Sequence, residues 1–350
     1  MATTMELASL ALLPEECANS QMVAILQQPN NMVTGYAEIP EPGQGEIRVK
    51  IKWVGICGSD LEAYRGTRKP EFLSIPARLG HEVAGCIDKL GPGVIGLRLG
   101  DHVTCRYVWG AFAEYIVCKP FNIKVVPPTI PLADVSLLEI LPGVIHTAEL
   151  AEITAAKNVL IMGQGVSGLV LTQVLRLFSP KNLVVTDLKD KNLALARKFG
   201  ATHTYKIPSP TTPTMEIVGK DFPHGFDIVV PCLLEGDGMV DAIDCAAMCG
   251  KIIMYGCIGI CRRPLDFFTV HRKRLAIIST EPRRDIDMRR YFQEGIQMAI
   301  DGLLNIQDIV THTVPLSRVT EAFSIRDAQL TDAIHVLVDC ERATDKVGKK

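Results

Sequence analysis

The sequence predicts an α/β protein with a doubly wound parallel sheet and a second, β-rich domain. The chain has 350 residues, more than one small hydrophobic core usually organises. Up to about residue 126, short apolar stretches alternate with glycine and proline turns, which is typical of a β-rich domain. Beyond residue 128, apolar strands alternate with segments of helical period, which indicates βαβ units and a parallel sheet.

These periods place the elements along the chain. In the first part, the expected strands cover residues 22–26, 45–54, 78–90, 101–105 and 112–118. In the second part, the expected helices cover residues 132–141, 144–152, 166–177, 191–199 and 239–248. The strands between and after them cover residues 158–162, 183–186, 227–230, 251–255 and 275–279. A long helix from about residue 287 and strands at 310–314 and 335–338 end the chain.

The domain boundaries follow from this order. Residues 1–20 precede the first strand as an N-terminal extension, with a helix expected at residues 6–13. Residues 21–146 together with 287–350 form the β-rich domain. Residues 147–286 form the doubly wound domain.

Composition excludes several classes of function. The net charge of −2 gives no reason to expect nucleic acid or an anionic membrane as partner. No apolar run reaches the roughly 18 residues of a membrane helix, and the start of the chain lacks the basic region of a signal peptide. Eleven cysteines in a large chain without an export signal indicate reduced thiols. We therefore expect a cytoplasmic protein whose cysteines are buried or bind metal.

A glycine-rich turn marks the cofactor site of the doubly wound domain. The segment GQGVSG, residues 163–168, lies between an expected strand and a helix that begins at Val166. Gly163 allows the tight turn, Gly165 lets the backbone approach a pyrophosphate, and Gly168 permits close packing of helix on strand. The helix N-terminus then offers N–H donors to the phosphates. This is the fingerprint of a Rossmann domain that binds a dinucleotide.

Asp187 sets the expected choice of cofactor. It ends the next strand, 19 residues after Gly168. A carboxylate there accepts hydrogen bonds from ribose hydroxyls and repels a 2′-phosphate, so NAD is favoured over NADP. Lys189 and Lys191 nearby keep NADP open, and Asp187 as a plain surface acid is the other alternative.

Two motifs in the first part carry a resemblance to a known family. They are GICGSD at residues 55–60 and GHE at residues 80–82, and 24 residues separate Cys57 from His81. Together with GDHV at 100–103, GAFAEY at 110–115 and the Rossmann half, the chain resembles the zinc alcohol dehydrogenase branch of the medium-chain dehydrogenase/reductase family. The resemblance implies a GroES-like catalytic domain, formed by the N-terminal part and the chain end, with the Rossmann domain inserted.

The resemblance also implies the metal ligands. Cys57 and His81 would bind one catalytic zinc ion, and Glu82 would approach it as in the polyol dehydrogenases. Glu139, seven residues before His146, matches the next ligand position. The family usually has Glu-Pro at that point, whereas this chain has Ile140 after the glutamate, so a carboxylate on a helix face remains the alternative.

The implied chemistry is the oxidation of an alcohol. Three protein ligands leave an open position on zinc, and zinc acidifies a bound alcohol so that hydride passes to the nicotinamide. Ser59 matches the hydroxyl that takes the alcohol proton, with a turn serine as the alternative. Asp60 matches the acid that orients the histidine ligand.

Three departures from the family pattern change the expected site. Residues 104–109 replace the cysteine-rich lobe of many members and hold one cysteine, so we predict no structural zinc. Glu62 stands where several members have the histidine that ends the proton relay, and it is either a relay or a solvated acid. His335 stands where members often have arginine or lysine near the pyrophosphate, and a neutral imidazole would give a weaker phosphate contact. On this view, His335→Arg tightens NAD binding.

These features predict hydride transfer between NAD and a secondary hydroxyl or ketone of a small polar molecule: a polyol, a cyclitol or a sugar derivative. One alternative is a biosynthetic dehydrogenase of an amino-cyclitol or hydroxy-amino acid. Another is a zinc-free quinone-reductase-like or non-catalytic NAD-binding relative, against which Cys57 and His81 argue. The basic segment 262–290 leaves open whether the substrate is anionic. We expect a homodimer or homotetramer.

Overall fold

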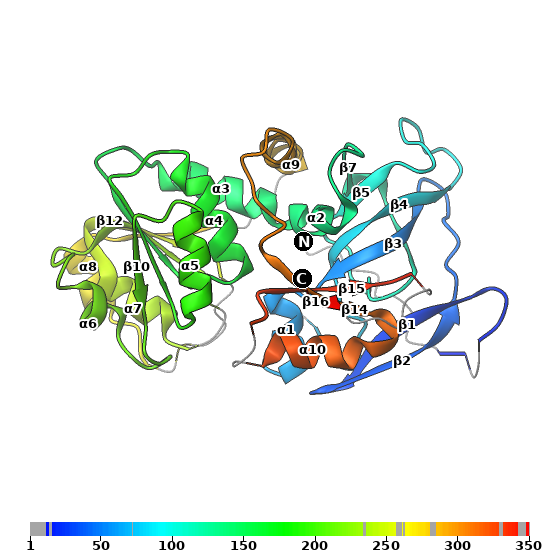
Figure 1. The fold of residues 1–350 in the computed structure, drawn as a ribbon, viewed down its shortest axis with the longest axis horizontal. Coiled ribbons are helices and arrows are strands. Elements are labelled where there is room, and N and C mark those ends of the chain that lie inside the picture. Colours follow the sequence, from blue (N-terminus) through cyan, green and yellow to red (C-terminus); the bar gives the residue numbers. More distant parts are fainter. Residues whose placement is uncertain are drawn as a thin grey trace. The chain divides into compact units, whose positions relative to one another are not determined.

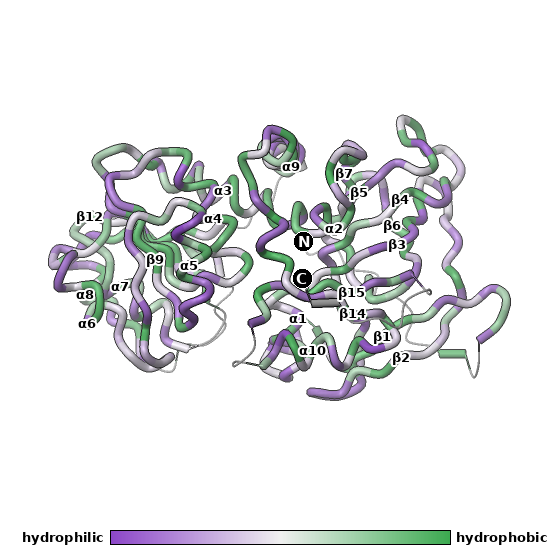
Figure 2. The backbone as a smooth tube through the Cα atoms, viewed as in Figure 1, coloured by the Kyte–Doolittle hydropathy of each residue, from purple (hydrophilic) through white to green (hydrophobic). Residues whose placement is uncertain are grey.

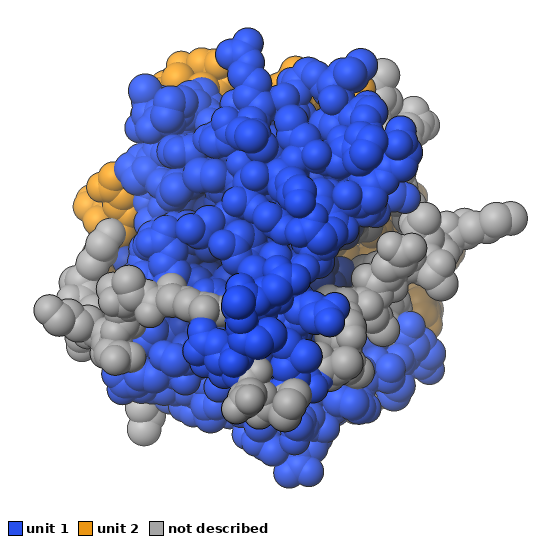
Figure 3. All heavy atoms as spheres, turned by 90° about the vertical axis from the view of Figure 1, so that its right-hand side faces the viewer, with its two compact units in different colours: residues 1–139, 310–350 blue, residues 140–309 orange. Residues whose placement is uncertain are grey.

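The computed structural model describes residues 12–13, 16–71, 73–233, 236–256, 261, 263–280, 285–328, 332–341 and 348–349. It divides into two compact units: unit 1 comprises Met1–Glu139 and Val310–Lys350, and unit 2 comprises Ile140–Ile309 (Figure 3). The helix expected at residues 6–13 falls almost entirely outside the described residues. Leu13, at its end, forms an isolated β-bridge with Tyr36.

Unit 1 is rich in strands, as its glycine and proline turns predict, and it also contains short helices. Its first part contains β1 (Ser20–Gln28), β2 (Asn31–Glu38), β3 (Ile47–Gly55), α1 (Gly58–Arg65), β4 (Glu82–Leu90), β5 (His102–Cys105), β6 (Tyr115–Cys118), the 3-10 helix η1 (Pro120–Asn122), β7 (Ile123–Val125), α2 (Leu132–Val135) and the 3-10 helix η2 (Ser136–Ile140). Its last part contains β14 (Val310–Pro315), the 3-10 helix η3 (Leu316–Arg318), α10 (Val319–Asp327), β15 (His335–Asp339) and β16 (Gly348–Lys349).

The sheet of unit 1 joins the two ends of the chain. Within the described residues its strand order is β16-β14-β15-β3-β4-β5-β7, and β6 pairs with β3. The pairing of β15 with β3 is antiparallel, so the chain end completes the sheet that the N-terminal part begins. A buried apolar core that includes Ile51, Val83, Phe112, Phe323 and Val336 holds these parts together.

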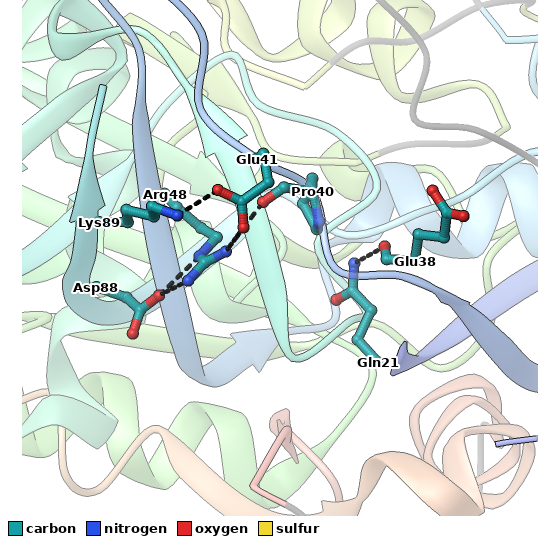
Figure 4. A network of polar contacts seen from close by, with 7 residues as sticks. All are labelled: Gln21, Glu38, Pro40, Glu41, Arg48, Asp88 and Lys89. Atoms are coloured by element: carbon teal, nitrogen blue, oxygen red, sulfur yellow. Dashed lines mark hydrogen bonds and ion pairs between the residues drawn. The ribbon is translucent and has the colours of Figure 1, made fainter. Parts of the chain in front are cut away.

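A polar network joins the start of β3 to the end of β4. Arg48 on β3 pairs with Asp88 on β4 at 2.6 Å and with Glu41 at 2.8 Å, and Lys89 also pairs with Glu41 (Figure 4). Glu41 is exposed, so its two pairs contribute little to stability. The Arg48–Asp88 pair is more shielded and connects β3 with β4.

Unit 2 alternates strands and helices. It contains α3 (Leu141–Ala151), β8 (Asn158–Met162), α4 (Val166–Arg176), β9 (Asn182–Asp187), α5 (Asp190–Lys198), β10 (His203–Lys206), α6 (Thr214–Val218), β11 (Phe226–Pro231), α7 (Gly238–Cys245), β12 (Ala246–Met254), α8 (Phe267–Lys273), β13 (Ala276–Ser279) and α9 (Asp285–Ile300). The helices α4, α5 and α7 lie beside the strands of this unit (Figure 1). The strands are coloured green where their residues are apolar (Figure 2).

The sheet of unit 2 is doubly wound. Its order is β10-β9-β8-β11-β12-β13 in the described residues, and neighbouring strands pair in parallel throughout this order. The first strand therefore lies inside the sheet and the order reverses beside it, as in a dinucleotide-binding domain. The predicted fold class, a doubly wound parallel Rossmann sheet with a second, β-rich domain, is confirmed by this topology.

The boundaries of the two compact units differ from the domain boundaries expected from the sequence. Residues 140–146 and 287–309 lie in unit 2, whereas the sequence pattern placed them in the β-rich domain. The reason is packing between α3 and α9. Tyr291 and Arg290 on α9 each bond the carboxylate of Glu149 on α3 at 2.7 Å, and the ring of Tyr291 lies 5.3 Å from that of His146.

Candidate functional site

The strand register of unit 1 brings the predicted metal ligands together. Gly55, the last residue of β3, lies opposite Glu82, the first residue of β4, and also opposite Leu337 on β15. Cys57 follows the end of β3 by two residues, and His81 directly precedes β4. Ligands that are far apart in the sequence therefore share one end of the sheet.

One group of three metal-binding side chains exists among the described residues. The ligand atoms of Cys57, His81 and Glu82 all lie within 4.8 Å of one another. A thiolate, an imidazole and a carboxylate are the donors that zinc takes in catalytic sites. Oε2 of Glu82 is buried and has no hydrogen-bond partner. A cation bound to this oxygen would compensate for the missing partner. The residues present fit a zinc ion.

Asp60 ties the two ligand segments to each other. It is fully buried, and its Oδ2 accepts a hydrogen bond from the backbone N–H of Cys57 at 3.1 Å. Its Oδ1 accepts one from the N–H of Gly80 at 3.1 Å and lies 3.6 Å from Nδ1 of His81. One carboxylate thus positions Cys57 and leaves Nε2 of His81 for the metal.

The ligands perturb one another electrostatically. Burial alone would raise the pKa of the Cys57 thiol, but His81 lowers it below its usual value, with a hydrogen bond from Ser59 helping. Burial alone would lower the pKa of His81, yet Asp60 and Cys57 raise it well above the usual value. Burial, followed by the charge of Cys57, raises the pKa of Glu82 well above normal. Such coupled shifts are typical of functional sites.

Gly55 is required by the crowding at this end of the sheet. A Cβ atom there would lie 2.2 Å from Oε2 of Glu82 and 2.6 Å from Nε2 of His335. A glycine within a strand often marks a close approach of this kind, so Gly55 is a signal in the sequence by which the crowding could have been found.

His335 lies beside the ligand Glu82, fully buried. Its Nε2 is 3.3 Å from Oε2 of Glu82, without hydrogen-bond geometry. Burial, then the positive charge of Arg326, lowers the pKa of His335 to about 3, so its imidazole is neutral at neutral pH. The neutral form agrees with the expectation from the sequence, and the phosphate contact stays a prediction.

Glu139 is held by an arginine that no sequence motif marks. Nη1 of Arg106 donates to Oε1 of Glu139 at 2.8 Å and to its backbone carbonyl at 2.8 Å. Both side chains are about nine-tenths buried. Glu139 is close enough to Glu82 to affect its pKa, yet it is not among the three grouped ligands. Its role as a ligand stays a prediction.

Arg106→Met tests that role through stability. Removing one partner of a buried ion pair typically costs about 3–5 kcal/mol. We expect this loss in the zinc-free protein and a smaller loss with zinc, because the metal would then pair with Glu139. The measurement is urea unfolding with and without a chelator, with the exposed Arg98→Met as control. Equal losses in both conditions would exclude Glu139 as a ligand.

Ser59 and Glu62 lie one turn apart on α1, on the same helix face. Ser59 is part exposed and stabilises the thiolate of Cys57. Glu62 is 9% exposed, which excludes the alternative of a solvated acid. Its Oε2 lies 4.0 Å from Nη1 of Arg68.

The glycine-rich turn of unit 2 has the expected geometry. Gly163 has a φ of 90°, which disfavours other residues, and α4 begins at Val166. A Cβ at Gly168 would lie 2.0 Å from the carbonyl oxygen of Gly163, whereas one at Gly165 meets nothing within 4 Å. The open space at Gly165 is where a pyrophosphate would approach the backbone.

Asp187, at the end of β9, reaches this turn. Its Oδ2 accepts a hydrogen bond from the N–H of Gln164 at 2.6 Å. Its Oδ1 accepts from the N–H of Lys189 at 2.8 Å and from Nδ2 of Asn192 at 3.2 Å. It is therefore fixed beside the turn.

Two alanine substitutions distinguish a glycine that cofactor binding requires from one that packing requires. Gly165→Ala should leave the free energy of unfolding within about 0.5 kcal/mol of the parent. It should weaken NAD binding at least about tenfold, through the loss of a phosphate hydrogen bond. Gly168→Ala should itself destabilise unit 2 by about 1–3 kcal/mol, because the new methyl group overpacks the turn. Thermal unfolding and NAD titration check both, and unchanged NAD affinity in Gly165→Ala would contradict the assigned cofactor site.

Comparison with known families agrees with this geometry. Residues 43–128 match the alcohol dehydrogenase GroES-like domain, and residues 167–298 match the zinc-binding dehydrogenase family. The first match covers the Cys57, His81 and Glu82 motifs, and the second begins within the glycine-rich turn and includes Asp187.

Three individual proteins illustrate the likeness. The chain is 30% identical over 276 residues to galactitol 1-phosphate 5-dehydrogenase of Escherichia coli K12, covering 69% of this chain and 78% of the relative. It is 27% identical over 336 residues to L-threonine 3-dehydrogenase of Deinococcus deserti, covering 87% and 94%. A crystal structure of the RspB alcohol dehydrogenase of Escherichia coli CFT073 with NADH has a TM-score of 0.80 at 24% identity, covering 92% and 100%.

Proposed function

Because the chain belongs to the zinc-dependent alcohol dehydrogenase family of medium-chain dehydrogenases, we propose that it transfers hydride between NAD and a secondary hydroxyl or ketone. The enzyme is a zinc-dependent dehydrogenase that acts on CH–OH donors. The observation that carries the proposal is the grouping of Cys57, His81 and Glu82 at one end of the sheet. We favour a polyol, a cyclitol or a sugar derivative as substrate, because this ligand pattern resembles the polyol dehydrogenases.

The metal would be held by Cys57, His81 and one glutamate, which leaves one position open. The glutamate would be Glu82, which is grouped with the other two ligands, or Glu139, which would first have to leave Arg106. When bound, zinc acts as a Lewis acid that favours ionisation of an alcohol. Asp60 keeps the thiolate and the imidazole in place through its contacts with Cys57 and His81.

Ser59 would accept the proton that the alcohol loses. It lies on the first turn of α1, two residues after Cys57. Glu62, one turn further, would take the proton onward, because a carboxylate accepts protons readily. Glu62 is 9% exposed and would release the proton to solvent after hydride transfer.

The dinucleotide would lie on the turn at 163–168. Gly165 leaves room for its pyrophosphate, and the N-terminus of α4 at Val166 offers N–H donors. Asp187 would accept hydrogen bonds from the ribose hydroxyls. When bound, NAD takes up the hydride.

A second candidate substrate is a hydroxy-amino acid or an amino-cyclitol. It is favoured by the similarity to L-threonine 3-dehydrogenase, which spans 94% of that relative. The zinc-free quinone-reductase alternative is disfavoured by the cluster at Cys57, which such proteins would not need.

The test is a substrate panel scored by NADH formation. It contains polyols, cyclitols, amino alcohols, hydroxy-amino acids and phosphorylated sugars, with metal-stripped protein as control. We expect turnover of at least one secondary alcohol that requires the metal. Quinone reduction that survives metal removal would overturn the proposal.

We also propose a homodimer or homotetramer in the cytoplasm. Ile277 on the edge strand β13 is 39% exposed, and a second copy would cover such an edge. No helix in the described part of the chain is long and apolar enough to span a membrane. Size-exclusion chromatography with light scattering measures the assembly.

A further inference from the structure

An arginine lies close to the metal ligands and is held by an aromatic ring. Arg68 follows α1, and its guanidinium carbon is 5.3 Å from the centre of the Trp109 ring. That ring in turn lies 4.4 Å from the imidazole of His81. Arg68, Trp109 and His81 therefore form a continuous stack that ends at a metal ligand.

The guanidinium of Arg68 is held in place, but some of its N–H donors have no partner among the described residues. Its Nη1 donates to the carbonyl oxygen of Ser59 at 3.3 Å and lies 4.0 Å from Oε2 of Glu62. Its Nε and Nη2 have no hydrogen-bond partner among the described residues. About 20% of its side chain is exposed, and Ser59, Cys57 and Trp109 are likewise part exposed.

The acidic groups nearby do not neutralise Arg68 strongly. Glu62 is at 4.0 Å, beyond hydrogen-bond distance. Asp60 is committed to two backbone N–H groups and to His81. A salt bridge this long leaves most of the guanidinium's donors available to a ligand.

A second guanidinium adds positive charge to the same site. Arg326 on α10 has a buried Nε without a hydrogen-bond partner, and its charge interacts with Cys57 and Glu82. A divalent cation held by these two ligands would neutralise them. The opposing charges that remain would be Asp60, which is committed to His81 and to two backbone N–H groups, and Glu62, which is 4.0 Å from Arg68. Arg326 would then add to the attraction of Arg68 for a negatively charged ligand.

We propose that Arg68 binds an anionic group of the substrate, a carboxylate or a phosphate, beside the metal ligands. This inference rests on the proposed function and narrows it to hydroxy acids and sugar phosphates over neutral polyols. A guanidinium fits either oxyanion through two parallel N–H donors, and the Trp109 face holds it in place before binding. Hydrogen bonds between charged groups should favour an anionic substrate over a neutral one by about 10- to 100-fold.

Binding can be measured without turnover. The chain has two tryptophans, so Trp53→Phe leaves Trp109, under Arg68, as the single tryptophan. In zinc-loaded Trp53→Phe protein we expect inorganic phosphate and acetate, at constant ionic strength, to change the Trp109 emission in a saturable way. Adding Arg68→Met should weaken the tighter of the two anions at least about tenfold. Arg98→Met, at an exposed arginine, is the matched control.

Each outcome of the titration decides the inference. Saturation that Arg68→Met weakens and Arg98→Met leaves intact supports it, and the tighter anion identifies the preferred group. No saturable change, or the same affinity in all three proteins, overturns it. The melting temperature of Arg68→Met is compared with that of its parent, and Arg68→Lys, which keeps the charge but not the planar fork, should bind with intermediate affinity.

Kinetics on matched substrate pairs complete the test. The pairs are galactitol 1-phosphate with galactitol, and L-threonine with L-threoninamide. We expect the member that carries the phosphate or carboxylate in one pair to have a kcat/KM at least about tenfold higher, and Arg68→Met to remove this advantage through KM. Equal or better use of the members that lack the phosphate or carboxylate overturns the inference and leaves the proposed function intact. If no alcohol at all is oxidised, the proposed function fails, and the Trp109 titration still decides the anion site.

Discussion

Replacing Cys57 with alanine is expected to reduce bound zinc from about one ion per chain to near none, and NADH formation by at least about 1,000-fold. Metal-ion catalysis supplies several kcal/mol of transition-state stabilisation, and each 1.36 kcal/mol is a factor of ten in rate. Cys57 is the thiolate of the three grouped ligands, and the proximity of His81 lowers the pKa of its thiol. Without it, a histidine and one carboxylate would have to hold the ion.

The control is Cys17→Ala, at an exposed cysteine outside the site. It should keep both zinc and activity. NAD binding should survive in both variants, because the glycine-rich turn and Asp187 belong to a different unit. Zinc analysis by mass spectrometry and NAD titration check this. Full zinc content in Cys57→Ala would mean that the metal binds elsewhere.

Replacing Asp187 with alanine is expected to change the cofactor preference. A carboxylate facing a 2′-phosphate costs several kcal/mol, so the parent should prefer NAD over NADP by at least about 100-fold in kcat/KM. Asp187→Ala should reduce this preference to about tenfold or less, mostly by losing efficiency with NAD, since a hydrogen bond from a ribose hydroxyl to the charged carboxylate is worth about 1.5–3 kcal/mol.

The matched control is Asp190→Ala, which removes an exposed carboxylate three residues further on. It should leave the preference unchanged. Asp187 also fixes the N–H groups of Gln164 and Lys189, so the melting temperature of unit 2 is followed in parallel. A parent enzyme that works better with NADP, or an unaltered preference in Asp187→Ala, contradicts the role given to Asp187.

Local patterns predicted much of the fold. The glycine-rich turn and Asp187 could be placed together because the parallel strands β8 and β9 end at the same edge. The motifs that contain Cys57 and His81 were recognised by resemblance, and the register of β3 against β4 explains why they meet. Local chemistry was enough to predict the glycine-rich turn, whereas the meeting of Cys57 with His81 was predicted only through the resemblance.

Other elements depend on contacts that sequence periodicity does not contain. The helix expected at residues 239–248 ends at Cys245, because β12 begins at Ala246 and pairs with β11. The helix expected at 132–141 is divided into α2 and the 3-10 helix η2. The short helix α1 and the strand β2 were not expected. In the first two cases tertiary packing overrode a local preference for helix.

The site was predicted less completely than the fold. Arg106, Arg68 and Arg326 had no motif to mark them, since nothing in the sequence says which acid or ring an arginine will meet. The contact of Trp109 with His81 depends on the loop that replaces the cysteine-rich lobe. Charged partners from distant segments are set by the fold and not by spacing.

The most direct test of a catalytic zinc site is the zinc content of the purified protein, measured together with its activity. We predict about one zinc ion per chain, loss of NADH formation when a chelator removes it, and recovery when zinc alone is returned. Activity that persists without metal would contradict a catalytic zinc at Cys57, His81 and Glu82. About two ions per chain would contradict the predicted lack of a structural zinc.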